Sequence, residues 1–186
     1  MSLYKKFRMR PLVVGLAIAV LRFAGPANND VIAATLPKDP CALLKPAAIQ
    51  TALDPNNNIG SGVPDTGMLP IGVGCTYTWG PRTNEWGQSA LTITVIDALK
   101  AWQGRSPDLI QEGLLTKAKA DGPNASQISG VGDAALFTFE ARSSNATVKA
   151  YFKAKAIHLS LIFHRGDSLQ TKDKVIALLK EAAARL

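Results

Sequence analysis

Apolar and polar residues alternate with the period of a β-strand in five separate stretches of this chain. The clearest stretch runs from Ala156 to Phe163, where every second residue from Ile157 onward is a large apolar one. β-Branched and aromatic residues fill the stretches, and turn-forming residues separate them, as at Gly80-Pro81. The predicted strands are residues 75–79, 90–96, 134–140, 147–152 and 156–163.

A helical period replaces this alternation on either side of the strands. Residues 169–185 carry apolar side chains at the spacing of one helix face, which predicts a closing helix. Ser106-Pro107-Asp108 is typical of a helix start, and the helix should run to about Lys119. Two short helical turns are expected at Asp39-Pro40 and from Pro46. The side chains that the 106–119 helix should bury are Leu109, Ile110, Leu114 and Leu115.

Helices at both ends of five mostly antiparallel strands predict an α+β fold, in which a mostly antiparallel sheet is flanked by helices. Residues 54–74 have no periodicity and contain five glycines and three prolines. A connection of this length is either mobile or used for binding, and we favour mobility.

The first residues of the chain look like an export signal. Residues 1–10 contain four basic residues, and residues 12–21 are an unbroken apolar run of ten. Such a run is too short to cross a membrane core of ~30 Å but suits a Sec-type signal peptide. We predict a signal peptide or anchor plus the start of a linker over residues 1–34, and a single domain over residues 35–186. The alternatives are a buried N-terminal helix or an uncleaved anchor, which would be the only membrane contact.

The positive charge of the chain belongs largely to this leader. The whole sequence carries a net charge of +7, whereas the residues after position 33 carry 16 basic and 13 acidic residues, a net charge of +3. Those charges are spread out, with no basic block of the kind that nucleic-acid-binding proteins show. No nucleic-acid partner is therefore expected.

Cys41 and Cys75 are the only two cysteines, and both follow the predicted leader. An even number of cysteines in an exported chain predicts a disulfide. The alternatives are two free thiols or a metal site, but two cysteines without nearby histidines are too few ligands for structural zinc. The expected location is periplasmic or secreted.

Short islands of the sequence resemble a family of exported bacterial proteins. They are Asp-Pro-Cys-Ala-Leu-Leu at 39–44, Gly-Cys-Thr-Tyr-Thr-Trp at 74–79 and Gly-Val-Gly-Asp-Ala-Ala at 130–135, followed by the closing helix. The family is the one catalogued as domain of unknown function 3558 (DUF3558), largely secreted proteins and lipoproteins of actinobacteria. The resemblance covers residues 39–186 and implies a Cys41–Cys75 disulfide and a fold like that of the Mog1/PsbP group. It implies no activity.

The chain departs from that family pattern at two places. Lys45 stands where a serine or threonine helix cap is usual, and no lipobox cysteine precedes the domain. The second departure puts lipid anchoring in doubt.

Each motif that could carry catalysis has a simpler structural interpretation. The glycines at 130 and 132 match a dinucleotide-binding motif, but that motif needs a strand before them and a helix after them. Here a strand follows, so we expect a turn and no cofactor.

His158 and His164 lie about 20 Å apart on one strand at ~3.3 Å per residue, too far to share a metal. We expect both to be solvated or hydrogen-bonded. Asp133 and Glu140 could form a glycosidase pair only if they faced each other across a cleft.

The remaining candidate is a contact surface. Trp79 follows the strand pattern and should be buried, whereas Arg82 and Trp86 lie in a polar, hairpin-like loop. An exposed tryptophan beside an arginine is typical of an interaction hot spot, although Trp86 could also fold back over the sheet edge. We predict a non-enzymatic, envelope-associated binding or interaction domain whose partner is an envelope protein or a small ligand. A hydrolase acting on envelope material with His158 or His164 as base, or a structural envelope component, are the alternatives.

Overall fold

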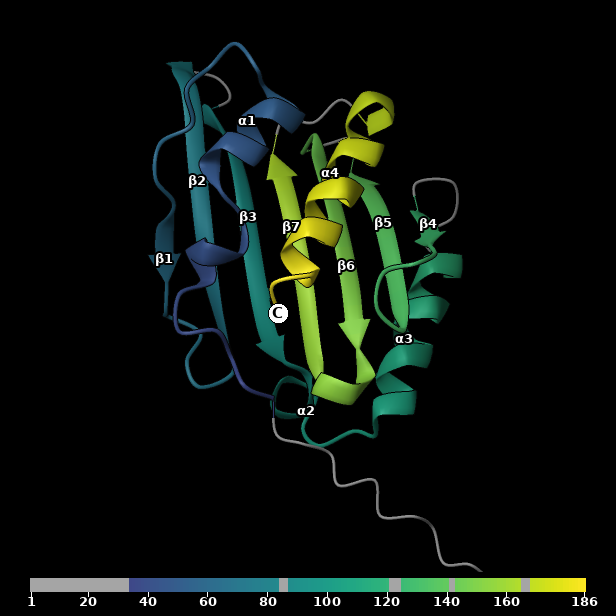
Figure 1. The fold of residues 1–186 in the computed structure, drawn as a ribbon. Helices are drawn as coiled ribbons and strands as arrows, with labels where there is room; N and C mark the ends of the chain where they lie inside the picture. The colour runs from purple at the N-terminus through teal and green to yellow at the C-terminus, as the bar shows by residue number, and fades with distance from the viewer. Residues whose placement is uncertain (1–33, 84–86, 121–124, 141–142, 165–167) are drawn as a thin grey trace, which may run out of the picture. The chain divides into compact units, whose positions relative to one another are not determined.

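Antiparallel strands form one sheet with helices on both of its faces (Figure 1). The structure is a computed structural model that describes residues 34–83, 87–120, 125–140, 143–164 and 168–186. In this part of the chain the sheet has seven strands in the order β1-β2-β3-β7-β6-β5-β4, and each pairs with its neighbours in antiparallel register. The predicted α+β class is confirmed. The strands are β1 (Val63–Asp65), β2 (Gly72–Thr83), β3 (Gly87–Asp97), β4 (Ala125–Ile128), β5 (Ala134–Glu140), β6 (Asn145–Phe152) and β7 (Ile157–His164).

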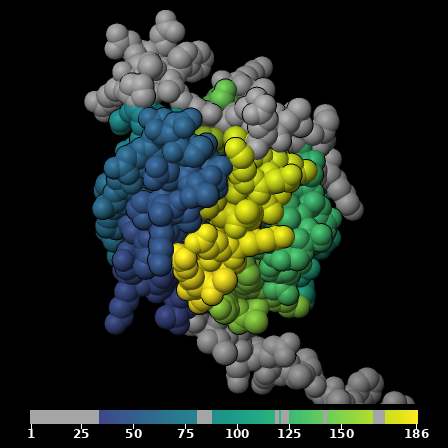
Figure 2. Space-filling model, turned by 45° about the horizontal axis from the view of Figure 1, so that its top comes forward, coloured from purple at the N-terminus to yellow at the C-terminus, as the bar shows by residue number. Residues whose placement is uncertain are grey.

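Short and long helices divide between the two faces of the sheet. On one face lie η1, α1 and α4, and Figure 2 shows the early part of the chain side by side with the yellow α4. On the other face α3 lies against β4 and β5, and α2 follows β3 directly. The helices are η1 (Pro40–Leu43), α1 (Pro46–Leu53), α2 (Ala98–Ala101), α3 (Pro107–Ala120), η3 (Lys153–Lys155) and α4 (Ser168–Ala183).

The alternating apolar side chains form the main core beneath η1, α1 and α4. Every second residue of β3 and β7 is buried there, as the sequence predicted. Trp79 is also in this core, where its ring stacks on Phe163 at 5.8 Å between centroids. Its indole N–H donates a hydrogen bond of 3.1 Å to the carboxylate of Asp54, which satisfies the polar group of a buried ring.

The Cys41–Cys75 disulfide is present and joins η1 to β2. The turn of η1 is fixed from its start, because the Asp39 carboxylate accepts a hydrogen bond of 2.9 Å from the Cys41 N–H. Beside the disulfide, the buried Tyr77 hydroxyl lies 2.6 Å from the carbonyl oxygen of Leu44 and donates to it. The segment before the sheet is therefore held to β2 by a covalent bond and a buried hydrogen bond.

The predicted turn at Gly80-Pro81 is wrong. β2 continues to Thr83, and its register with β3 shifts between Trp79 and Thr83. Gly80 has a φ of 77°, so it supplies the left-handed residue that such an irregularity requires. Proline is tolerated at a bulge, which explains why Pro81 does not end the strand.

Part of the long connection at residues 54–74 is folded, which its glycines and prolines concealed in the sequence. Val63–Asp65 form β1, and the last residues of the connection begin β2. Ile59 is buried in the main core. Gly62 lies against the disulfide so closely that a Cβ there would collide with the Cys75 sulfur. The prediction of a connection without secondary structure is therefore wrong for these parts.

The predicted leader at residues 1–33 lies outside the described residues, so it stays a prediction. Within the described ranges, none of the helices is long and apolar enough to span a membrane.

Candidate functional site

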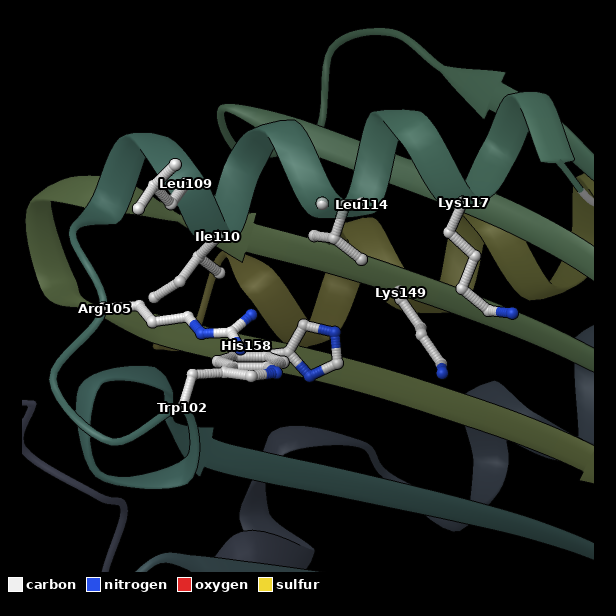
Figure 3. A pocket seen from close by; sticks show the side chains of 9 residues that line it. Trp102, Arg105, Leu109, Ile110, Leu114, Lys117, Lys149 and His158 are labelled. Atoms are coloured by element: carbon white, nitrogen blue, oxygen red, sulfur yellow. The ribbon is translucent and has the colours of Figure 1, made fainter.

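A cavity of about 250 Å³ lies between α3 and the sheet (Figure 3). At about 30 Å³ per water molecule in the liquid, this volume corresponds to about eight waters. A shallow, largely open depression of about 510 Å³ adjoins it and shares four of its lining residues, Arg105, Leu109, Gly113 and Lys117. The first cavity is lined by Trp102, Arg105, Leu109, Ile110, Gly113, Leu114, Lys117, Lys149 and His158.

The connection between β3 and α3 forms one end of the cavity. The buried Asp97 carboxylate caps α2 by accepting a hydrogen bond of 3.1 Å from the Lys100 N–H. After α2, Gln103 and Gly104 both have positive φ, at 53° and 74°. These two residues reverse the chain, so α3 returns across the sheet and Trp102 and Arg105 reach the cavity.

The helical period of α3 forms the roof. Ile110 and Leu114, one turn apart, are buried against a second apolar cluster that includes Ala134 and Tyr151. Gly113 is an exposed residue at the mouth of the cavity, and a Cβ built there meets nothing within 4 Å. The prediction that Leu109 is buried is wrong: 57% of it is exposed, because it lies at the edge of the helix face that contacts the sheet.

Two neighbouring strands form the floor. Tyr151 of β6 pairs with His158 of β7, and Lys149 pairs with Ser160, so these side chains share the face beneath α3. The Trp102 ring meets the His158 ring edge-on, with 5.3 Å between centroids. Figure 3 shows the imidazole between Trp102 and Lys149 at the base of the cavity.

His158 is buried without a hydrogen bond. Only 6% of the residue is exposed, and neither ring nitrogen has a partner among the described residues. Burial, together with the positive charge of Lys149, lowers the pKa of His158 to about 4. The ring is therefore neutral near pH 7, with one unpaired donor and one unpaired acceptor. The expectation of a solvated or hydrogen-bonded side chain is wrong for His158 but right for His164, whose Nδ1 lies 2.8 Å from Oδ1 of Asn145.

The charges that line the cavity all have one sign. Arg105, Lys117 and Lys149 contribute three cations, and the lining contains no aspartate or glutamate. The nearby Asp108 carboxylate is bound to Lys153, with 2.6 Å between Oδ1 and Nζ. No side-chain hydrogen bond or ion pair holds the Arg105 guanidinium among the described residues. The cavity is therefore apolar in its depth and cationic at its edges.

The carboxylates considered for catalysis do not face each other. Asp133 comes directly before β5, where its Oδ2 accepts a hydrogen bond of 2.6 Å from the Lys153 N–H. Glu140 ends the same strand and accepts a hydrogen bond of 2.7 Å from the Ser143 hydroxyl. The two residues belong to opposite ends of β5, so they do not form a pair across a cleft.

The glycine motif at 130–135 is a turn that leads into a strand, as predicted. Gly130 and Gly132 have φ values of 75° and 59°, and β5 begins at Ala134. In the described part of the chain, no group of three or more His, Cys, Asp or Glu residues is arranged to hold a metal.

The predicted contact surface is only partly visible. Trp86 lies outside the described residues, and the backbone of Arg82 lies in β2. The interaction surface at these two residues stays a prediction.

The sequence did not single out most of the residues that line the cavity. Trp102, Arg105, Lys149 and His158 come from segments that meet only because β6 pairs with β7 and α3 packs on the same face of the sheet, against β4 and β5. Lys149 and His158 each stand on the polar face of an alternating strand, so the local pattern gave no signal that set them apart. The pairing that puts them on one surface was not readable from either strand alone.

Comparisons with models of protein families, with curated proteins and with solved structures gave no match to this chain.

Proposed function

We propose that this chain is an exported, non-enzymatic binding domain and that the cavity beneath α3 is its ligand site. The observation that supports this proposal is that a cavity with a cationic edge contains the buried imidazole of His158, which has no hydrogen-bond partner among the described residues. Concave, mostly apolar cavities with a few convergent polar groups are the usual form of small-molecule sites. An unpaired polar group in the floor is one that a bound ligand or water can satisfy.

The export part of the proposal rests on the leader and the disulfide. The disulfide indicates an oxidising environment, which agrees with a periplasmic or secreted location. The basic and apolar pattern of residues 1–34 supports a signal peptide or anchor. The antiparallel sheet between helices agrees with the resemblance to DUF3558 and with a Mog1/PsbP-like fold, and we propose both assignments on that basis.

The same geometry argues against a hydrolase. A serine hydrolase needs a base hydrogen-bonded to the nucleophile and oriented by a third group. His158 makes no such bond, and a pKa near 4 leaves it a weak base at neutral pH. The nearby Ser160 lies two residues along the same strand. These observations favour binding without chemistry.

Complementation tests the proposal in a strain that lacks the gene. Gly113→Leu places a large side chain at the mouth of the cavity and should abolish complementation, whereas Ser160→Ala, Asp133→Asn and Glu140→Gln should each preserve it. Ala177→Leu is the matched control, because it enlarges an exposed residue of α4 on the opposite face. Full activity of Gly113→Leu, or loss of activity in a folded and exported carboxylate or serine variant, would refute the proposal.

A further inference from the structure

We infer that the ligand of the cavity beneath α3 is a small organic acid whose anionic group meets Arg105 and whose apolar body lies against Trp102, Ile110 and Leu114. This inference rests on the proposed function and adds the chemical class of the ligand. Three features of the cavity support this inference: the sign of its charges, the nature of its walls and its volume.

The charges favour an anion over a neutral ligand. A neutral ligand would take water away from the Arg105 guanidinium and return no charge, which costs free energy. An anionic group compensates for that loss. The planar guanidinium of Arg105, which lacks an ion pair within the described residues, matches the two oxygens of a carboxylate or the oxygens of a phosphate. In Figure 3 it extends from the α2–α3 connection toward His158.

The walls favour an organic ligand over an inorganic ion. Ile110 and Leu114 offer no hydrogen bond toward a bare phosphate or sulfate, and the Trp102 ring offers only its indole N–H, whereas all three can bury an apolar group. The neutral His158 ring adds a single polar contact without a fourth charge. The edge-on packing of His158 and Trp102 leaves both rings as part of the wall.

The volume limits the size of the ligand. A space of about 250 Å³ is below the range of roughly 300–1,000 Å³ that is usual for drug-sized ligands. At ~30 Å³ for each water-sized group, it holds about eight non-hydrogen atoms, so the end of an acid such as octanoate would reach the mouth of the cavity. A larger acid would have to extend past Gly113 into the adjoining depression.

The test uses octanoate, which has one carboxylate and a short apolar chain, as the probe for the full chain with its disulfide formed. Binding is measured by calorimetry and by the shift of the Trp102 indole N–H signal in NMR spectra. We expect octanoate to bind at least tenfold more tightly than 1-octanol and than acetate. Arg105→Gln should weaken octanoate binding about tenfold, consistent with the loss of one charged hydrogen bond.

Two matched pairs of variants locate the site. Gly113→Leu should abolish octanoate binding, because the side chain occupies open space and leucine favours a helix. Ala177→Leu and Lys174→Gln change exposed residues of α4 on the opposite face and should leave the affinity within twofold of the original.

The possible results separate the inference from the proposed function. If 1-octanol binds as tightly as octanoate and Gly113→Leu removes both, the cavity is a binding site but the acid inference is wrong. The same holds if acetate binds as tightly as octanoate, since no apolar body is then needed. If none of the probes binds, or if octanoate binding survives Gly113→Leu, both the inference and the cavity as ligand site are refuted.

Discussion

His158 is a buried polar ring, with 6% of the residue exposed and no hydrogen-bond partner among the described residues. Leaving a buried donor or acceptor unpaired costs about 1–3 kcal/mol of folding free energy. The protein nevertheless places this ring in the floor of a cavity, beside Lys149, where a positive charge also disfavours protonation. The consequence is a folded state that accepts a proton on His158 less readily than the unfolded chain does.

The folding stability should therefore fall as the solution becomes acidic. The unfolded chain binds a proton on histidine near pH 6.5, whereas the folded chain does so only near pH 4. Stability decreases with falling pH wherever the unfolded state binds more protons than the folded state. His158 should therefore lower the free energy of unfolding by up to about 3 kcal/mol between pH 6.5 and pH 4. Urea unfolding at a series of pH values measures this loss.

The matched variants for that measurement are His158→Leu and Ser160→Ala. His158→Leu removes the titrating ring from the same site and should flatten the pH dependence, while Ser160→Ala leaves it in place and should keep the original slope. A His158→Leu variant that loses stability with acid as steeply as the original chain would contradict the prediction.

Among the elements, α3 and the turn before β5 use glycine for opposite reasons. Gly113 is in the middle of α3, has ordinary helical geometry and has open space where a side chain would be. Gly132 has a φ of 59°, and a Cβ there would collide with the carbonyl oxygen of Tyr151. The first glycine leaves a cavity open, and the second allows the turn to approach β6.

Alanine at these two positions should consequently have opposite effects. Gly113→Ala should raise the free energy of unfolding by up to about 1 kcal/mol, because alanine favours a helix and meets no obstacle. Gly132→Ala should lower it by at least about 1 kcal/mol, because the left-handed backbone and the close carbonyl are both unfavourable. Chemical denaturation compares the two. Destabilisation by Gly113→Ala would show that the space beneath α3 is not open.

For the whole molecule, the disulfide joins the segment before the sheet to β2. Its two cysteines are 34 residues apart, a loop whose closure contributes about 4 kcal/mol in the chain-entropy model. Reduction should lower the stability by 2–4 kcal/mol. The double variant Cys41→Ser, Cys75→Ala should show no further loss when reductant is added. Two cysteines that are alkylated without reductant in the exported protein would contradict the disulfide.

Export is the second property of the whole molecule that can be measured. Residues 1–34 fused to a phosphatase that is active only after export should give an active reporter. Ile18→Arg, which places a charge inside the apolar run, should abolish that activity, and residues 35–186 fused to the same reporter should give none. An active reporter with the Ile18→Arg leader would show that the apolar run is not the export signal.

The chain by itself determined much of the fold, because that information is local. The strand periods of β3, β5, β6 and β7, the start of α3 at Ser106-Pro107 and the closing helix are each encoded in a few consecutive residues. The two cysteines could pair only with each other. Local patterns failed where glycine and proline obscured them, as in β1 and at Pro81, and where a short strand such as β4 has too few residues to show a period.

The candidate site was decided by the tertiary structure. From the sequence, His158 looked like an ordinary strand histidine, because its burial depends on α3 and on Trp102 at the end of α2, both of which are far from it in sequence. Arg105, Lys117 and Lys149 read as dispersed surface charges for the same reason. A period tells which residues share a face of one element. Only the pairing of β6 with β7, and the return of α3 along the same face of the sheet against β4 and β5, bring three cations and a neutral imidazole around one cavity.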